Sequence, residues 1–230
     1  MNNPTNAGME NAGPSLHAAV EHLDWSAVVA LLKRGQSIDA RDEQGNSPLL
    51  AACRSGRIEA VRKLIQFGAN VEAANDAGHT PLIAAVLAEE AEAVQALLKA
   101  GARVTAATGL NAYTVLHWAL AKPPRNPEKV AAIVQMLLLA GAGVNHQSRD
   151  GTTPLMHAAW YGSERAASVL LERGADPELG DSRGRLALSL ARERGHESIG
   201  RLLETAIAAK NRKKQGAFSK FVRWWRAEDK

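Results

Sequence analysis

One short pattern recurs at a fixed interval and constrains the fold more than any other feature of the chain. A turn rich in Asp or Asn contains a glycine and is followed by Ser/Thr-Pro-Leu at Gly45, Gly78 and Gly151, and by a degraded version at Gly184. Gly45 and Gly78 lie 33 residues apart, and so do Gly151 and Gly184. A period of this size indicates stacked copies of one supersecondary unit rather than a single closed core.

Each copy predicts a turn followed by two short helices. Glycine supplies the turn geometry, Ser or Thr can cap the next helix, and proline suits its first position. A second helix follows, with apolar residues at helical spacing such as Ile58, Val61, Leu64 and Ile65. It is closed by a glycine, as at Gly68, Gly101, Gly141 and Gly174. One copy cannot bury its own apolar face, so the sequence predicts an all-α helical solenoid.

The period, the turn-Thr-Pro-Leu pattern and a closing Leu-Leu-x-x-Gly-Ala pattern together resemble the ankyrin-repeat family. The resemblance covers residues 14–204, in six repeats at about 14–41, 42–74, 75–107, 108–147, 148–180 and 181–204. It implies antiparallel helix pairs with β-turn fingers, a concave face that binds a protein partner, and no cofactor. Residues 1–13 are expected to be disordered, and residues 205–230 are expected to form a separate tail.

The fourth repeat departs from the period. It has six extra residues between Leu116 and Leu137, including three prolines within 122–129. Because proline interrupts a helix interior, we expect a protruding loop there and not a simple helix extension.

Trp160 and Tyr161 are the candidate anchors for a partner. By register they end a first helix, where the resemblance places exposed, variable positions on the binding face. Large aromatic side chains are typical interface anchors. The alternative is that they pack on the loop of the preceding repeat and seal it. Four residues of earlier repeats would complete a groove with an aromatic C-terminal half and a polar N-terminal half: Arg54, Leu87, Tyr113 and Lys122.

No catalytic, metal or phosphate-binding pattern stands out. The sequence has no His-Glu-x-x-His spacing, no cysteine cluster and no Gly-rich phosphate loop. His17 and His117 occupy a repeat position where the resemblance implies hydrogen bonds to the backbone between fingers. Cys53 lies in an apolar stretch, which favours an inert core thiol. We therefore expect a non-enzymatic chain without cofactor or metal.

The C-terminal tail differs in charge from the rest of the chain. Residues 205–230 carry eight Lys/Arg and two acidic residues, a net charge of +6, which leaves −2 for residues 1–204. Apolar residues there are spaced along one stripe of a helix, with basic residues beside them: Phe218, Phe221, Val222 and Trp225 form the stripe, and Lys220 and Arg223 flank it. Residues 210–216 are expected to form a flexible basic hinge before this helix.

Three interpretations of this basic amphipathic helix remain open. It can lie on an anionic membrane surface, dock in the groove of a partner, or cover the apolar flank of the last repeat. Nucleic acid is disfavoured, because the body is net acidic and the basic run is short.

The sequence as a whole predicts a monomeric protein-protein interaction adaptor. We find no secretory signal pattern and no apolar run long enough for a transmembrane helix. The expected location is cytoplasmic. The alternative is a membrane-peripheral adaptor attached through the tail at the inner membrane face.

Overall fold

A computed structural model describes the backbone of residues 15–228 and the side chains of residues 15–216. Within these residues the chain contains twelve helices, two isolated β-bridges and no sheet, which confirms the predicted all-α fold. Residues 1–13, expected to be disordered, lie outside the described part. The chain divides into an N-terminal unit, Met1–Arg103, and a C-terminal unit, Val104–Lys230.

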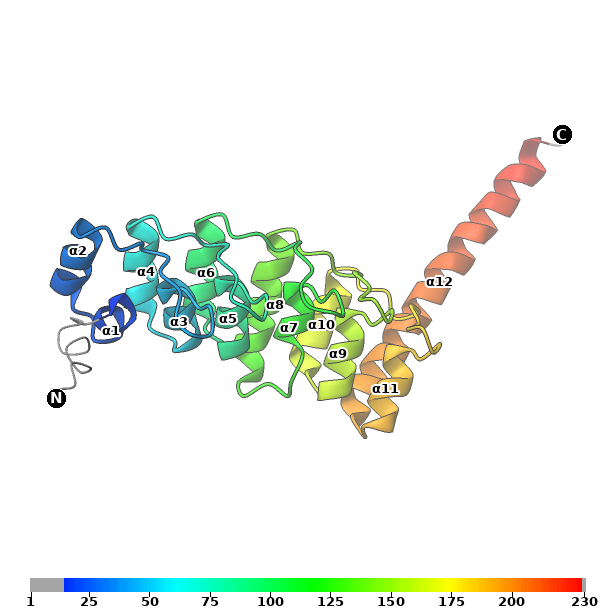
Figure 1. The fold of residues 1–230 in the computed structure, drawn as a ribbon. Coiled ribbons are helices and arrows are strands. Elements are labelled where there is room, and N and C mark those ends of the chain that lie inside the picture. Colours follow the sequence, from blue (N-terminus) through cyan, green and yellow to red (C-terminus); the bar gives the residue numbers. More distant parts are fainter. Residues whose placement is uncertain (1–14, 229–230) are drawn as a thin grey trace, which may run out of the picture. The chain divides into compact units, whose positions relative to one another are not determined.

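The N-terminal unit consists of three helix pairs in two layers (Figure 1). The pairs are α1 (Leu16–Glu21) with α2 (Trp25–Lys33), α3 (Pro48–Arg54) with α4 (Ile58–Gln66), and α5 (Pro81–Ala88) with α6 (Ala91–Lys99). First helices pack on first helices, α1 on α3 and α3 on α5, and the second helix α4 packs on α6. Leu49, Leu64, Leu82 and Leu97, which recur with the period, are at most 1% exposed and form the core.

The C-terminal unit repeats this arrangement. Its pairs are α7 (Val115–Ala119) with α8 (Pro127–Leu139), α9 (Pro154–Tyr161) with α10 (Glu164–Glu172), and α11 (Ala187–Glu193) with α12 (Glu197–Glu228). Here α7, α9 and α11 pack in sequence, as do α8, α10 and α12. The equivalent leucines, Leu116, Leu137, Leu155 and Leu170, are again buried.

The Ser/Thr-Pro pattern starts helices as predicted. Proline is the first residue of α3, α5 and α9, and the residue before it caps the helix. The cap hydroxyls of Ser47, Thr80 and Thr153 accept hydrogen bonds from backbone N–H groups at 3.2–3.3 Å. The closing glycines Gly68, Gly101, Gly141 and Gly174 have φ between 82° and 92°, a conformation that other residues resist.

Backbone hydrogen bonds join neighbouring fingers, the turn segments between helix pairs. The Ser182 amide donates to the Asp150 carbonyl at 2.8 Å, and the Arg149 amide donates to the Asn111 carbonyl at 2.9 Å. His17 Nε2 lies 2.9 Å from the Asn46 carbonyl, and His117 Nε2 lies 3.0 Å from the Thr152 carbonyl. A carbonyl can only accept, so both Nε2 atoms carry the proton. The predicted structural role of these two histidines is confirmed.

The insertion in the fourth repeat differs in part from the prediction. α8 has thirteen residues, whereas α4, α6 and α10 have nine, so the second helix of this repeat is four residues longer. Pro127 is the first residue of α8, and Asn126 caps it by accepting from the Lys129 amide at 3.0 Å. Proline is favoured at this position because its missing N–H would have no partner anyway. The expected loop is present, since residues 120–126 separate α7 from α8 whereas two or three residues separate the helices of the other pairs. The expectation that proline excludes a helix extension was wrong.

The hinge predicted at residues 210–216 is also wrong. α12 is continuous from Glu197 to Glu228 and extends well beyond the other helices of its unit (Figure 1). Lys210 Nζ lies 2.5 Å from Asp176 Oδ1 and 2.8 Å from Glu178 Oε2, and Lys214 Nζ lies 3.0 Å from Glu178 Oε2. Lysine, arginine and glutamine are also good helix formers. The segment is therefore a helix attached to the preceding finger.

Candidate functional site

The predicted aromatic anchors lie in one pocket of the C-terminal unit. The pocket has a volume of about 180 Å³, and its lining residues come from α9, α11 and the fingers before α7, α9 and α11. They include Tyr113, Trp160 and Tyr161, three of the six predicted partner-binding residues. All three side chains are half-buried, which leaves part of each ring open to a partner. We call this cavity the aromatic pocket.

The position of the anchors follows from the length of α9. The helix begins at Pro154 and ends before Gly162, which adopts φ 74°, so Trp160 and Tyr161 occupy its last turn. The Arg194 guanidinium lies 4.5 Å from the centre of the Trp160 ring, a cation–π contact worth about 0.5–1 kcal/mol at an exposed site. His196 Nε2 lies 3.2 Å from the Trp160 carbonyl oxygen and can donate to it. These contacts attach Trp160 to the following repeat, whereas the sealing alternative assigned it to the preceding loop.

Beside the pocket, aromatic and histidine rings form a compact cluster. The Tyr113 ring stacks on His117 with centroids 5.2 Å apart and meets His157 edge-on at 5.1 Å. His157 also contacts His117 at 5.4 Å and Tyr161 at 6.1 Å. His117 is fully buried and His157 is 8% exposed. Burial lowers the pKa of each imidazole to about 4, so both rings are neutral near pH 7.

Arg185 brings a fixed positive charge to the pocket wall. Its Nε donates to Asp181 Oδ2 at 2.8 Å, and Asp181 Oδ1 accepts from the backbone amides of Arg183 and Arg185. Burial opposes the charge on Asp181, but these hydrogen bonds hold the pKa of its carboxyl below the ordinary value. The ion pair therefore persists throughout the neutral range and orients the guanidinium.

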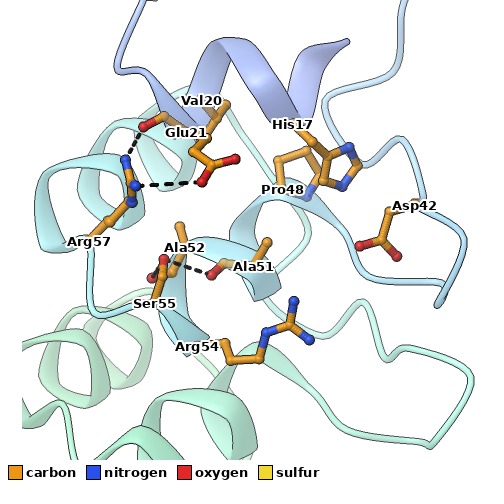
Figure 2. A pocket seen from close by; sticks show the side chains of 10 residues that line it. All are labelled: His17, Val20, Glu21, Asp42, Pro48, Ala51, Ala52, Arg54, Ser55 and Arg57. Carbon is orange, nitrogen blue, oxygen red and sulfur yellow. Dashed lines mark hydrogen bonds and ion pairs between the residues drawn. The ribbon is translucent and has the colours of Figure 1, made fainter.

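Arg54 lines a different pocket, inside the N-terminal unit. This pocket has a volume of about 350 Å³ and small apolar residues, including Ala51 and Ala52, in its lining. Figure 2 shows Arg57 beside Glu21 on one side, with Arg54 at the lower edge of the view. Arg57 donates to the Glu21 carbonyl, and its guanidinium lies 3.7 Å from the Glu21 carboxylate. Arg54 donates to Gln44 Oε1 at 3.3 Å.

The other predicted site residues lie elsewhere. Leu87 is half-buried near the end of α5, in the N-terminal unit. Lys122 is half-buried between α7 and α8 and is not among the residues that line the aromatic pocket. The structure therefore brings together the three aromatic residues of the prediction, while the single continuous groove stays a prediction.

Three residues around the aromatic pocket were missed by the sequence analysis: His157, Arg185 and Arg194. Arg194 could have been found, because it lies 33 residues after Tyr161 and belongs to the next repeat at the same position. His157 could also have been found, because it lies four residues before Tyr161 on the same helix and therefore on the same face. Arg185 stands at a position without a recognisable pattern, and the packing of α11 on α9 brings it to the pocket.

The apolar stripe of the tail lies on α12, but its side chains are outside those that the structure describes. This applies to Phe218, Phe221, Val222, Trp225, Lys220 and Arg223. No helix in residues 15–228 is both long enough and apolar enough to cross a membrane.

Metal-binding and thiol chemistry find little support among the described side chains. No group of three or more His, Cys, Asp or Glu residues within that part of the chain could hold a metal ion. Cys53 is fully buried, and burial raises the pKa of its thiol to about 12. A thiol in this state is a poor nucleophile.

Comparison with known protein families agrees with the repeat geometry. A family model described as ankyrin repeats in three copies matches residues 16–108 and 116–214. The chain belongs to the ankyrin-repeat family. The family comparison found ankyrin repeats alone, and these repeats are in general protein-protein interaction modules.

Curated relatives of this ankyrin-repeat protein share segments of the array. The chain is 36% identical over 84 residues to the putative ankyrin repeat protein YahD of Escherichia coli K12, covering 34% of this chain and 42% of that protein. It is 37% identical over 103 residues to the probable E3 ubiquitin-protein ligase XBOS34 of Oryza sativa subsp. japonica, covering 40% of this chain and 20% of that protein. It is 41% identical over 69 residues to the potassium channel AKT1 of Oryza sativa subsp. indica, covering 30% of this chain and 7% of that protein. The chain thus spans less than half the length of each.

Proposed function

We propose that this ankyrin-repeat protein is a non-enzymatic adaptor that binds a protein partner through its fingers and first helices. The observation that carries the proposal is the aromatic pocket, where Trp160 and Tyr161 are half-buried beside Tyr113. Aromatic side chains that are partly buried and held by neighbours can be covered by a partner at low entropic cost. Met156, Leu190 and the aromatic rings make the lining mainly apolar, and its one charged residue, Arg185, is already paired with Asp181.

Replacing both anchors, Trp160→Ala with Tyr161→Ala, is expected to weaken partner binding at least about tenfold, since buried aromatic anchors each contribute about 2 kcal/mol or more. The melting temperature should fall only slightly, because both rings are already partly exposed. Binding is measured by pull-down from native lysate and then by titration of the recovered protein. Leu139→Ala is the control, because Leu139 is 65% exposed at the end of the second helix α8.

Equal recovery of the partner by the double variant would assign binding to another surface. A loss of binding that parallels a large fall in melting temperature would instead favour a packing role for the two rings.

A second proposal, of a different class, is that the C-terminal part of α12 attaches the protein to an anionic membrane. It is supported by the aromatic stripe at residues 218–225 and by the length of α12. Lys210 and Lys214 are engaged by Asp176 and Glu178. Six of the eight basic residues in the tail are then left for a membrane, and four of them lie beyond Gly216: Lys220, Arg223, Arg226 and Lys230.

Full-length protein is expected to co-sediment with phosphatidylserine vesicles, and a chain ending at Gly216 is expected to lose most of this binding. Each basic residue near such a surface contributes about 1 kcal/mol, so loss of four should be easily measured. Ending the chain at Gly216 keeps the Lys210 and Lys214 contacts, which a chain ending at Glu204 would remove. Neutral phosphatidylcholine vesicles are the control. If both chains partition alike, the membrane proposal fails.

A further inference from the structure

The residues in and around the aromatic pocket indicate which kind of partner segment it binds. We propose that it receives one hydrophobic side chain from a segment of the partner that carries acidic residues beside that anchor. This inference rests on the proposed protein-binding function and specifies the kind of sequence that the site selects.

The interior of the aromatic pocket favours an apolar anchor. Met156 and Leu190 contribute to its lining and are 1% and 4% exposed. The rings of Tyr113, Trp160 and Tyr161 supply further apolar surface, and His157 is neutral near pH 7 because it is buried. A charged side chain in this space would lose its hydration, and the one charged group in the lining, Arg185, is already paired with Asp181. An aliphatic or aromatic side chain has no charge to dehydrate, and its burial in the pocket is favourable.

Arginines dominate the segments around the pocket. Residues 149–152 and 181–194 contain five arginines and three acidic residues. Arg185 is paired with Asp181, and Arg192 is paired with Glu204 at 2.6 Å. Among the acids, the Asp150 carboxylate is already engaged, because it accepts from the Ser148 hydroxyl at 2.5 Å. The charge excess on these segments therefore favours an acidic partner segment.

Arg194 is the residue best placed to bind an acidic residue that lies next to the hydrophobic anchor in the partner segment. Its guanidinium is held over the Trp160 ring, at the edge of the pocket, and is exposed. In the described part of the chain, no carboxylate or carbonyl accepts a hydrogen bond from it. A guanidinium held over an aromatic ring still has N–H groups that are free to bind a carboxylate, and its planar fork can do so bidentately. The contact with Trp160 also limits the side-chain entropy that Arg194 would lose on binding.

Selection from a library of random twelve-residue peptides displayed on phage tests the proposal. Full-length protein is the target, and the Trp160→Ala/Tyr161→Ala variant is used for counter-selection. The expected peptides bind only the wild-type pocket and carry a hydrophobic residue flanked by Asp or Glu. Affinities of the selected peptides are then measured by fluorescence anisotropy at low and at physiological salt.

Charge reversal then isolates the role of Arg194. Arg194→Glu is expected to weaken the selected peptides at least about fivefold at low salt and to reduce the salt dependence of binding. Arg173→Glu is the matched control: it makes the same charge change at the end of α10, at an exposed residue that does not line the pocket, and should change affinity less than about twofold. Circular dichroism verifies that both variants are folded.

Each other outcome overturns a defined part of the proposal. Pocket-dependent peptides that are basic or uncharged would overturn the acidic specificity and leave the protein-binding function intact. Peptides that bind the double variant equally well would overturn the pocket as their site. The absence of any enriched peptide would overturn recognition of a short segment. In each case, the lysate pull-down decides separately whether the proposed function holds.

Discussion

Lowering the pH from about 7 to about 4.5 is expected to destabilise the fold by about 2–3 kcal/mol for each of two buried histidines. His117 and His157 are neutral in the folded protein because burial lowers their pKa to about 4. Protonation of His157 is further opposed by its Nδ1 atom, which is buried and has no hydrogen-bond partner among the described residues. A proton there would add a donor without an acceptor.

The sign of this effect follows from which state binds the protons. The ordinary pKa of histidine is 6.5, above the folded value of about 4. Between these two values the unfolded chain takes up protons that the folded chain refuses, so unfolding becomes more favourable as the pH falls. The stability is fully present above pH 6.5 and is lost as the pH approaches 4. Asp150, the nearby carboxylate, raises the pKa of both rings and opposes the trend only in part.

Urea unfolding followed by circular dichroism at several pH values checks this prediction. His157→Leu should remove about half of the pH dependence, because leucine cannot titrate and has a similar size. Met156→Leu, at the neighbouring buried position of α9, is the matched control and should retain the wild-type dependence. A His157→Leu variant with the wild-type dependence would show that this imidazole is not the group that titrates.

The repeat fold could be predicted because its determinants are local and periodic. Proline, the capping hydroxyl and the closing glycine each act on one helix end, and their positions relative to one another repeat along the chain. Ser47 and Pro48 start α3 in the structure as their types predict, and Gly68 closes the second helix with positive φ. Burial of Leu49 and Leu64 follows from the same spacing.

The errors arose where a residue's neighbours in space decide the outcome. Pro127 was taken as an interruption, but it becomes favourable once Asn126 caps the helix in front of it. Lys210 was assigned to a flexible hinge, but Asp176 and Glu178 bind it from a finger more than thirty residues earlier. Neither partner is marked by the sequence pattern around residue 210.

Only part of the candidate site could be predicted, because some of its residues are placed by local spacing and others by contacts between repeats. Register alone placed Trp160 and Tyr161 at the end of a first helix. The Arg194 guanidinium over the Trp160 ring depends on how α9 packs against α11, and the period alone does not give that packing in detail. A periodic sequence therefore predicts the backbone of such an array better than the chemistry of its pockets.

Gly151→Ala is expected to cost about 3 kcal/mol or more of unfolding free energy, whereas Gly184→Ala should cost only about 1–2 kcal/mol. Both glycines have similar positive φ, 79° and 73°, so alanine carries the same backbone penalty at each. The surroundings differ. A Cβ on Gly151 would lie 2.9 Å from the Ser182 amide nitrogen and 3.0 Å from Asp181 Cα, whereas a Cβ on Gly184 meets nothing within 4 Å.

The extra cost at Gly151 reflects the close approach of two fingers. The Asp150 carbonyl accepts from the Ser182 amide at 2.8 Å, so the two backbones cannot separate to admit a methyl group without losing this hydrogen bond. Urea unfolding of both variants measures the difference. Equal losses would mean that the fingers can move apart freely and that positive φ alone requires glycine in the repeat pattern. A larger loss at Gly151 would mean that one recurring glycine serves both the turn and the contact between repeats.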